Sequence, residues 1–408
     1  PWRMFAGTAY LIATWAGVTC LWPAPYPIPG FFGWKGIATM WFTVGVCTIG
    51  LIGAFLTDRL AQSLETAKMM GRYRLVRRLG SGGMGDVHLA FHASLRRPGW
   101  AANGSNEVLQ SLCLAYGGAG RRVLTFEPTY AMHSHIAKVC GSEVLVGTRA
   151  DDFTVDAPGA RRLILTERPA ITFLCSPNNP TGAVYPDETL KAIVAIAREH
   201  GLIVFADEVY DKVLYEGVTH TSIGALSEDV LTVTFNGLSK NYRSCGYRAG
   251  WMVVSGDRKP AGDYIEGLNM LASMRLCANV PGQYAIQTAL GGYQSIDDLV
   301  APGGRLRRQR DLAYELITAI PGVSCVKPKA TLYMFPKLDP KLYPIQDDQQ
   351  FIAELLEQEK VLLVQGTGFN WPSPDHFRLV FLPYEDDLKV AVGRIARFLE
   401  GYRKRHGQ

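Results

Sequence analysis

From about residue 100 onward, short apolar runs alternate with helical stretches such as Asp187–His200. This alternation is typical of an α/β fold, and it predicts a mostly parallel sheet with helices on both faces. The predicted strands are Ala170–Cys175, Leu202–Ala206, Val230–Phe235 and Ala249–Val254.

The last hundred residues show a different order of elements. Gln349–Glu359 and Asp386–Tyr402 are typical of helices, and His376–Leu382 is typical of a strand. The sequence therefore predicts a large domain over residues 100–300 and a smaller C-terminal α+β domain over residues 301–408.

The first hundred residues differ from the rest in charge. Met4–Trp22 and Gly36–Thr57 contain no charged residue, and about 20 apolar residues span a bilayer. Basic residues flank the two runs. By the positive-inside rule we predict that residues 1–70 form a two-helix membrane hairpin with both ends in the cytoplasm, with membrane contact through residues 4–57. The alternative is a pair of buried core helices.

A glycine-rich stretch follows these runs. Gly80-Ser-Gly82-Gly-Met-Gly85-Asp-Val87 matches the pattern GxGxxGxV and resembles the glycine-rich hairpin of bacterial serine/threonine kinases. The chain has no VAIK-type lysine after Ala90, no HRD motif and no DFG motif. Phosphoryl transfer by a kinase needs the catalytic aspartate of HRD and the metal-binding aspartate of DFG. Residues 71–99 are therefore predicted to form a hairpin with glycine turns, and a kinase-derived nucleotide binder is the least favoured interpretation.

Composition excludes several classes of function. The formal net charge is only +5 over 408 residues, which is too weak to argue for a nucleic-acid partner. The eight cysteines form no CxxC pair, so we expect neither a zinc site nor a disulfide framework, and a reducing compartment is favoured. The histidines lack metal-ligand spacing and are predicted to be structural: His133, His135, His200, His220 and His376. No metal is expected.

Four short polar segments follow predicted strands, which is where ligands bind in α/β sheets. They are Ser176–Gly182, Phe205–Tyr210, Asn236–Lys240 and Gly246–Gly250. In this order they resemble the class I/II pyridoxal-phosphate aminotransferases of fold type I, over roughly residues 100–408. The resemblance implies pyridoxal 5'-phosphate as cofactor, amino-acid and 2-oxo-acid substrates, and a homodimer, because the family's active sites lie at a subunit interface.

The resemblance also implies catalytic roles for Lys240, Asp207 and Tyr210. Lys240 would carry the cofactor and, once displaced, move the proton as a free amine. Asp207 would keep the pyridine nitrogen protonated, which makes the ring an electron sink. Asn179 and Tyr210 would donate hydrogen bonds to the phenolate oxygen of the ring. The structural alternatives are a helix cap for Asp207 and turn chemistry for Asn179.

Further residues would complete the cofactor and substrate sites. Ser239 and Arg248 would hold the phosphate, together with the loop residues Gly104, Ser105 and Asn106, which precede an apolar helix. Tyr130 would stack on the cofactor. Arg378 would bind the α-carboxylate of the substrate, with Asn179 beside it.

The resemblance is uneven along the chain. Residues 100–177 look most like histidinol-phosphate aminotransferases, whereas residues 178–408 look most like bacterial alanine aminotransferases through segments such as Leu363–Pro383. Because Arg378 belongs to the second part, an alanine-like amino donor with an acceptor such as 2-oxoglutarate is favoured. Histidinol phosphate is the alternative substrate.

Residues 1–97 contain no match to the N-terminal segment that the family normally has, which includes a tyrosine that reaches the neighbouring subunit's cofactor. We therefore expect a composite chain, joined near Pro98–Trp100 and again near Pro177, in which turnover is impaired. An interpretation from another class is a membrane-tethered protein whose cytoplasmic aminotransferase-like part binds a ligand without turnover.

Overall fold

The computed structural model describes residues 69–70, 73–82, 85–92, 98–276 and 278–407. The chain divides into two compact units, Pro1–Met69 and Met70–Gln408, and the short strand β1 (Met69–Met70) spans the division. The hydrophobic runs of the predicted membrane hairpin lie outside the described residues. Within the ranges that are described, no helix has both the length and the apolar character needed to cross a membrane.

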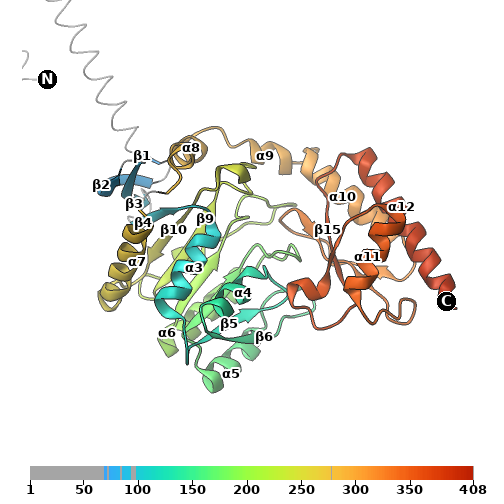
Figure 1. The fold of residues 1–408 in the computed structure, drawn as a ribbon, viewed down its shortest axis with the longest axis horizontal. Helices are drawn as coiled ribbons and strands as arrows, with labels where there is room; N and C mark the ends of the chain where they lie inside the picture. The colour runs from blue at the N-terminus through green and yellow to red at the C-terminus, as the bar shows by residue number, and fades with distance from the viewer. Residues whose placement is uncertain (1–68, 71–72, 83–84, 93–97, 277, 408) are drawn as a thin grey trace, which may run out of the picture. The chain divides into compact units, whose positions relative to one another are not determined.

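A large sheet forms the centre of the second unit (Figure 1). Seven consecutive strands of it, which end at the edge strand β6, lie in the order β4-β10-β9-β8-β7-β5-β6. The five from β9 to β6 are parallel neighbours. This confirms the prediction of an α/β fold with a mostly parallel sheet. The strands are β4 (Pro98–Ala102), β5 (Arg122–Phe126), β6 (Glu143–Gly147), β7 (Ile171–Cys175), β8 (Ile203–Asp207), β9 (Thr232–Gly237) and β10 (Gly250–Ser255).

One strand of the core runs against the others. β10 pairs antiparallel with both β9 and β4. The connection from β9 to β10 holds only the short 3₁₀ helix η2 (Cys245–Tyr247), so the chain returns beside β9 without the crossover helix that a parallel neighbour requires. Beyond β4 the sheet continues through β3 (Gly85–His92) to β2 (Tyr73–Gly82), which pair antiparallel.

Helices cover both faces of the sheet, and each face has its own apolar core. On one face lie α3 (Ser105–Tyr116), α4 (Met132–Val139) and α7 (Gly262–Arg275). On the other lie α5 (Ala157–Glu167) and α6 (Asp187–His200). The bounds of α6 match the predicted helix, which has acidic residues in its first turn and ends at Gly201 in the left-handed conformation.

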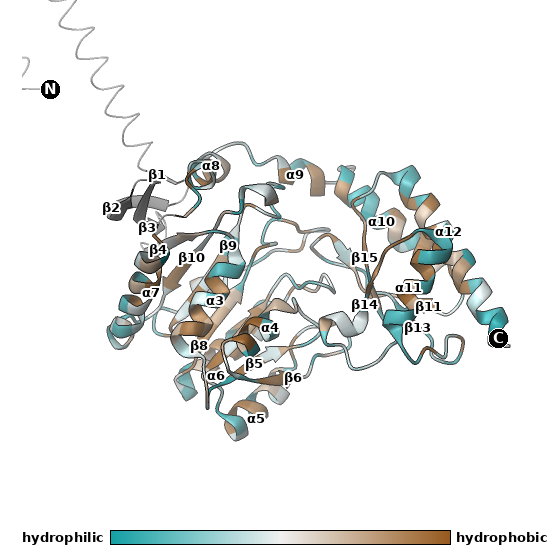
Figure 2. Ribbon diagram, viewed as in Figure 1, coloured by the Kyte–Doolittle hydropathy of each residue, from teal (hydrophilic) through white to brown (hydrophobic). Residues whose placement is uncertain are grey.

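The C-terminal part packs around a separate core, which it shares with Tyr210 and Tyr215. Hydrophilic and hydrophobic residues alternate along the last helix, α12 (Figure 2), as expected where one face of a helix is buried. The helices are α9 (Ser295–Val300), α10 (Arg305–Thr318), α11 (Asp348–Glu359) and α12 (Glu385–Arg405). Helix α8 (Val280–Gly291) precedes them and packs instead on β10, in one apolar cluster with Trp251 and Val253. The strands are β11 (Val323–Ser324), β12 (Tyr333–Met334), β13 (Lys337–Leu338), β14 (Val364–Gln365) and β15 (Phe377–Val380). Three further 3₁₀ helices connect elements: η1 (Ile223–Ala225), η3 (Lys259–Ala261) and η4 (Gly366–Phe369).

Candidate active site

The polar segments predicted from the sequence converge on one cavity of about 290 Å³. They do so because β7, β8 and β9 are parallel neighbours, so the segments that follow them meet at one edge of the sheet. Every predicted site residue except Gly104 lines the cavity: Ser105, Asn106, Tyr130, Asn179, Asp207, Tyr210, Ser239, Lys240, Arg248 and Arg378. The lining also includes Cys175, Val209, Cys245 and Tyr333, which were not predicted.

Asp207 is buried at the end of β8. Its Oδ2 atom lies 3.1 Å from Nε2 of His133 on α4, and its Oδ1 atom accepts a hydrogen bond from the backbone N–H of Val209. The ring of His133 stacks on Phe173, with 5.0 Å between ring centroids. These contacts hold the carboxylate in one orientation beside the cavity.

His133, which was predicted from the sequence to be structural, does not line the cavity but contacts Asp207, which does. The available signal was its closeness in sequence to Tyr130, which lies just before α4 and accepts a backbone hydrogen bond from the N–H of His133. The two rings meet edge to face at 5.7 Å. Tyr130 donates a hydrogen bond to Oδ1 of Asn106, and burial raises the pKa of Tyr130 although this hydrogen bond lowers it.

Gly104 does not line the cavity and lies immediately before α3. Its φ of +94° is in the region that favours glycine, and a Cβ atom there would lie 2.8 Å from Nη2 of Arg248. Arg248 in turn donates through Nη1 to the carbonyl oxygen of Cys245. The missing side chain therefore allows a guanidinium to lie against the first turn of α3, where backbone N–H groups lack helical partners. This combination suits a phosphate group.

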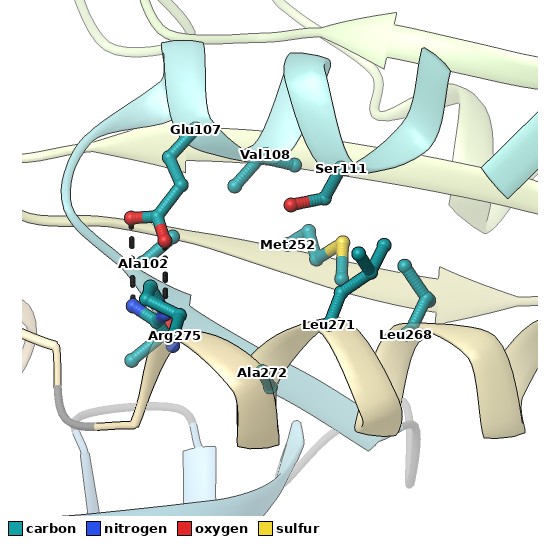
Figure 3. Close-up of a pocket in the computed structure, with 10 residues that line it drawn as sticks. Ala102, Glu107, Val108, Ser111, Met252, Leu268, Leu271, Ala272 and Arg275 are labelled. Carbon is teal, nitrogen blue, oxygen red and sulfur yellow. Dashed lines mark hydrogen bonds and ion pairs between the residues drawn. The ribbon is translucent and has the colours of Figure 1, made fainter. Parts of the chain in front are cut away.

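An ion pair supports this loop from the side of α7. Glu107 of α3 and Arg275 at the end of α7 contact each other directly and both line a small cavity of about 30 Å³ (Figure 3). Nε of Arg275 lies 2.8 Å from Oε1 of Glu107, and Oε2 accepts a hydrogen bond from the backbone N–H of Asn103. Glu107 thus connects the loop before Gly104 to α7.

Two side chains from a distant part of the sequence contact the hydroxyl of Tyr333 on β12. The hydroxyl of Tyr210 donates to the hydroxyl of Tyr333 at 2.9 Å, and Nζ of Lys240 donates to the same oxygen at 3.5 Å. Burial raises the pKa of Tyr210 well above its ordinary value, and the nearby Tyr333 raises it further. Tyr210 therefore keeps its proton at neutral pH.

Arg378 reaches the cavity from β15. Its Nη1 donates to Oδ1 of Asn179 at 3.1 Å, and its guanidinium carbon lies 4.4 Å from the ring centre of Tyr333 and 4.8 Å from that of Phe369. The Nε atom is buried without a hydrogen-bond partner, and burial lowers the pKa of Arg378. A half-buried guanidinium with a donor to spare is suited to bind a carboxylate.

The described part of the chain also contains thiol groups and other side chains that can bind metals. Its cysteines Cys113, Cys140, Cys175, Cys245 and Cys325 are free, and burial raises the pKa of Cys175 to about 12. Within that same part, no group of three or more His, Cys, Asp or Glu side chains could hold a metal ion.

Comparison with known proteins agrees with this geometry. Residues 98–395 match the family model described as aminotransferase class I and II. The glutamate-pyruvate aminotransferase AlaA of Escherichia coli (strain K12) is 52% identical over 305 residues, which are 74% of this chain and 75% of that protein. An alanine aminotransferase of Mycobacterium bovis is 47% identical over 311 residues, 75% of this chain and 71% of that protein.

A solved structure shows the same fold. The crystal structure of an aminotransferase from Escherichia coli superposes with a TM-score of 0.73 at 52% identity, covering 75% of this chain and 76% of that one. The matched region contains every residue that lines the cavity. The chain belongs to the class I and II aminotransferases.

Proposed function

We propose that the protein is a pyridoxal-phosphate-dependent aminotransferase that moves an amino group between an alanine-like amino acid and a 2-oxo acid such as 2-oxoglutarate. The observation that carries this proposal is that Lys240, Asp207 and Arg378 line the same cavity. An amine, a carboxylate and a carboxylate-binding guanidinium are the groups that such a reaction needs. The substrate pair is supported by the similarity to proteins named glutamate-pyruvate and alanine aminotransferase.

The residues present fit pyridoxal 5'-phosphate. Nη2 of Arg248 lies 2.8 Å from the position that a Cβ of residue 104 would take, so a guanidinium, Ser239 and the first turn of α3 are available for the phosphate. The buried Asp207 would pair with the pyridine nitrogen, and Tyr130 offers an aromatic face. A cavity of about 290 Å³ is close to the lower limit of about 300 Å³ for ligand pockets.

The chain's own residues would perform the steps around the cofactor. When bound, the cofactor would supply an electron sink for the electron pair of the broken Cα–H bond. Lys240 would take up the α-proton as a free amine and then, as an ammonium ion, give it back to another atom of the bound complex. Arg378 and Asn179 would hold the substrate carboxylate. Because Tyr210 donates its proton to Tyr333, the amide N–H of Asn179 is the group that would donate to the ring's phenolate oxygen.

We also propose that the cavity lies between a large domain, residues 100–300, and a small domain, residues 301–408. Lys240 and Asp207 come from the first, and Tyr333 and Arg378 come from the second. Movement of the small domain over the cavity would then exclude water around the substrate.

A homodimer is part of the proposal. Large apolar side chains are exposed near the junction of α7 and α8, among them Met274 at 80% and Tyr284 at 75%. Exposed apolar groups of this kind mark surfaces that bind another protein. A second copy of this chain is the partner that the family resemblance implies.

The test begins with the purified protein and pyridoxal phosphate. We expect a visible absorbance band that is lost in Lys240→Ala and retained in Lys191→Ala, which replaces an exposed lysine of α6. The holoprotein should then form pyruvate from alanine when 2-oxoglutarate is present. Absence of the band in the wild-type protein overturns the cofactor assignment. A band without pyruvate formation contradicts the alanine assignment, and amino transfer from histidinol phosphate instead would identify the alternative substrate.

A further inference from the structure

We propose that Tyr333 is a further catalytic residue of the amino-transfer reaction, because its hydroxyl holds the Lys240 amine in place while that amine takes up the substrate proton. This inference rests on the proposed function and adds a residue to its proton-transfer step. Tyr333 lies on the two-residue strand β12, far in sequence from the segments that predicted the site.

The hydrogen bonds of Tyr333 are the first argument. A phenolic hydroxyl has two lone pairs and one proton. Its oxygen accepts from the hydroxyl of Tyr210 at 2.9 Å and from Nζ of Lys240 at 3.5 Å, which occupies both lone pairs. The proton of Tyr333 is therefore left to be donated to a ligand in the cavity that Tyr333 lines.

The rigidity of Tyr333 is the second argument. The side chain is buried, and its backbone pairs with Val380 of β15, two residues after Arg378 on the same strand. The guanidinium of Arg378 lies over the ring at 4.4 Å. One fixed side chain thus contacts both the group that would move the proton and the group that would hold the substrate carboxylate.

The proton-transfer step explains why these contacts would affect the rate. An N–H bond forms between Nζ of Lys240 and the α-hydrogen, and the Cα–H bond breaks. The electron pair of that bond moves into the bound cofactor, and the amine becomes an ammonium ion. An ammonium ion is a stronger hydrogen-bond donor than an amine, so the contact with the oxygen of Tyr333 strengthens as the proton arrives. Interactions that are stronger in the transition state than in the ground state accelerate a reaction.

Tyr215 provides a matched control on the same chain. It is also a buried tyrosine, its hydroxyl donates at 2.8 Å to the carbonyl oxygen of Thr331, and the guanidinium of Arg310 lies 4.6 Å from its ring centre. Tyr215 does not line the cavity. Tyr215→Phe therefore removes a comparable hydroxyl without touching Lys240.

The experiment compares Tyr333→Phe, Tyr215→Phe and the wild-type holoprotein in a single half-reaction with alanine, followed by the absorbance of the bound cofactor. We expect Tyr333→Phe to slow the half-reaction by about 10- to 100-fold, the range for a lost hydrogen bond to a charged group. The isotope effect with α-deuterated alanine should increase, and the affinity for pyridoxal phosphate should change by less than about threefold. Tyr215→Phe should match the wild type in all three measurements.

A second variant separates the hydrogen bond from a general loss of packing. In Tyr333→Gln the amide oxygen can still accept from Nζ of Lys240, so part of the lost rate should return. Equal rates in Tyr333→Phe and Tyr215→Phe overturn the inference, and so does a Tyr333→Gln variant that is as slow as Tyr333→Phe.

A measurement without turnover keeps this inference distinct from the proposed function. The apoprotein is mixed with pyridoxal phosphate, and the growth of the absorbance band reports capture by Lys240. Tyr333→Phe should capture several-fold more slowly than Tyr215→Phe. If the wild-type protein captures the cofactor but does not transaminate, the proposed function fails, while slower capture in Tyr333→Phe still supports the contact with Lys240. Equal capture in both variants then overturns the inference.

Discussion

Nε2 of His133 on α4 lies 3.1 Å from Oδ2 of Asp207 at the end of β8, and both side chains are buried. Replacement of His133 by Phe keeps an aromatic ring against Phe173 but removes the hydrogen bond to the carboxylate. We expect the affinity for pyridoxal phosphate to fall by about 10- to 100-fold, because a hydrogen bond to a charged group contributes about 1.5–3 kcal/mol. Titration of the apoprotein with the cofactor measures this.

The control for His133→Phe is His135→Ala, which changes an exposed histidine on the same helix. It should leave the affinity unchanged. Equal affinities in the two variants would show that His133 does not position Asp207.

The contact between Gly104 and Arg248 gives a second prediction. In Gly104→Ala the new Cβ would lie 2.8 Å from Nη2 of Arg248 and would displace the guanidinium from its place against α3. We expect cofactor affinity to fall at least about tenfold, as loss of one charge-assisted hydrogen bond would produce. Gly118→Ala is the matched control, because Gly118 also has positive φ, +112°, but open space around its Cβ position.

Both glycine variants carry the cost of a left-handed residue, so thermal unfolding should shift to a similar extent in the two. The difference in cofactor affinity therefore isolates the contact with Arg248. If Gly118→Ala loses as much affinity as Gly104→Ala, the effect comes from backbone strain alone.

Arg378 gives a third prediction, about the substrate. Arg378→Lys keeps the charge but loses the planar pair of donors and the stacking between Tyr333 and Phe369. We expect the KM for amino donors to rise by about 10- to 100-fold, with cofactor affinity unchanged. Steady-state kinetics measure the first and cofactor titration the second. Arg121→Lys, at an exposed position before β5, should leave both values as they are.

The ion pair between Glu107 and Arg275 gives a prediction about stability. Its side chains are 24% and 19% exposed, whereas those of the pair Glu199–Arg161 are 47% and 45% exposed. Double-mutant cycles with alanine should give a coupling free energy above about 1 kcal/mol for Glu107 and Arg275. For Glu199 and Arg161 the coupling free energy should fall in the range of about 0.2–1 kcal/mol that is usual for exposed pairs. Chemical unfolding of the four variants of each cycle measures this.

Glu107→Ala should also weaken cofactor binding, because Glu107 holds the backbone N–H of Asn103 beside the phosphate loop. Glu199→Ala should not. A coupling free energy for Glu107 and Arg275 no larger than that of the exposed pair would contradict the role of this ion pair as a support for the loop.

The parallel part of the fold could be predicted because strands that are buried on both faces of a sheet have a clear hydrophobic pattern in the sequence. A strand such as Ile171–Cys175 is buried at every position, so it appears as an uninterrupted apolar run. Helix α6 was predicted with its observed bounds because charged first and last turns mark its ends. The residues that follow these strands were predicted to gather because parallel strands bring their carboxyl ends to one edge.

Other features could not be predicted because their causes are not local. The reversed direction of β10 depends on which neighbours it pairs with, and its apolar run is the same in either direction. Tyr333 lies on a strand of two residues, too short for any alternation to show. His133 contacts a carboxylate that is 74 positions later in the chain.

The loop that carries Lys240 and Arg248 is anchored at both ends by strands that pair with each other, β9 and β10, so that Gly237 faces Gly250. The segment between Asn179 and Asp207 also joins paired strands, β7 and β8, but it passes through the whole of α6. One residue inserted between Lys240 and Arg248 would change the separation of amine and guanidinium without disturbing any strand. The spacing between the amine and the guanidinium therefore depends on the length of this loop.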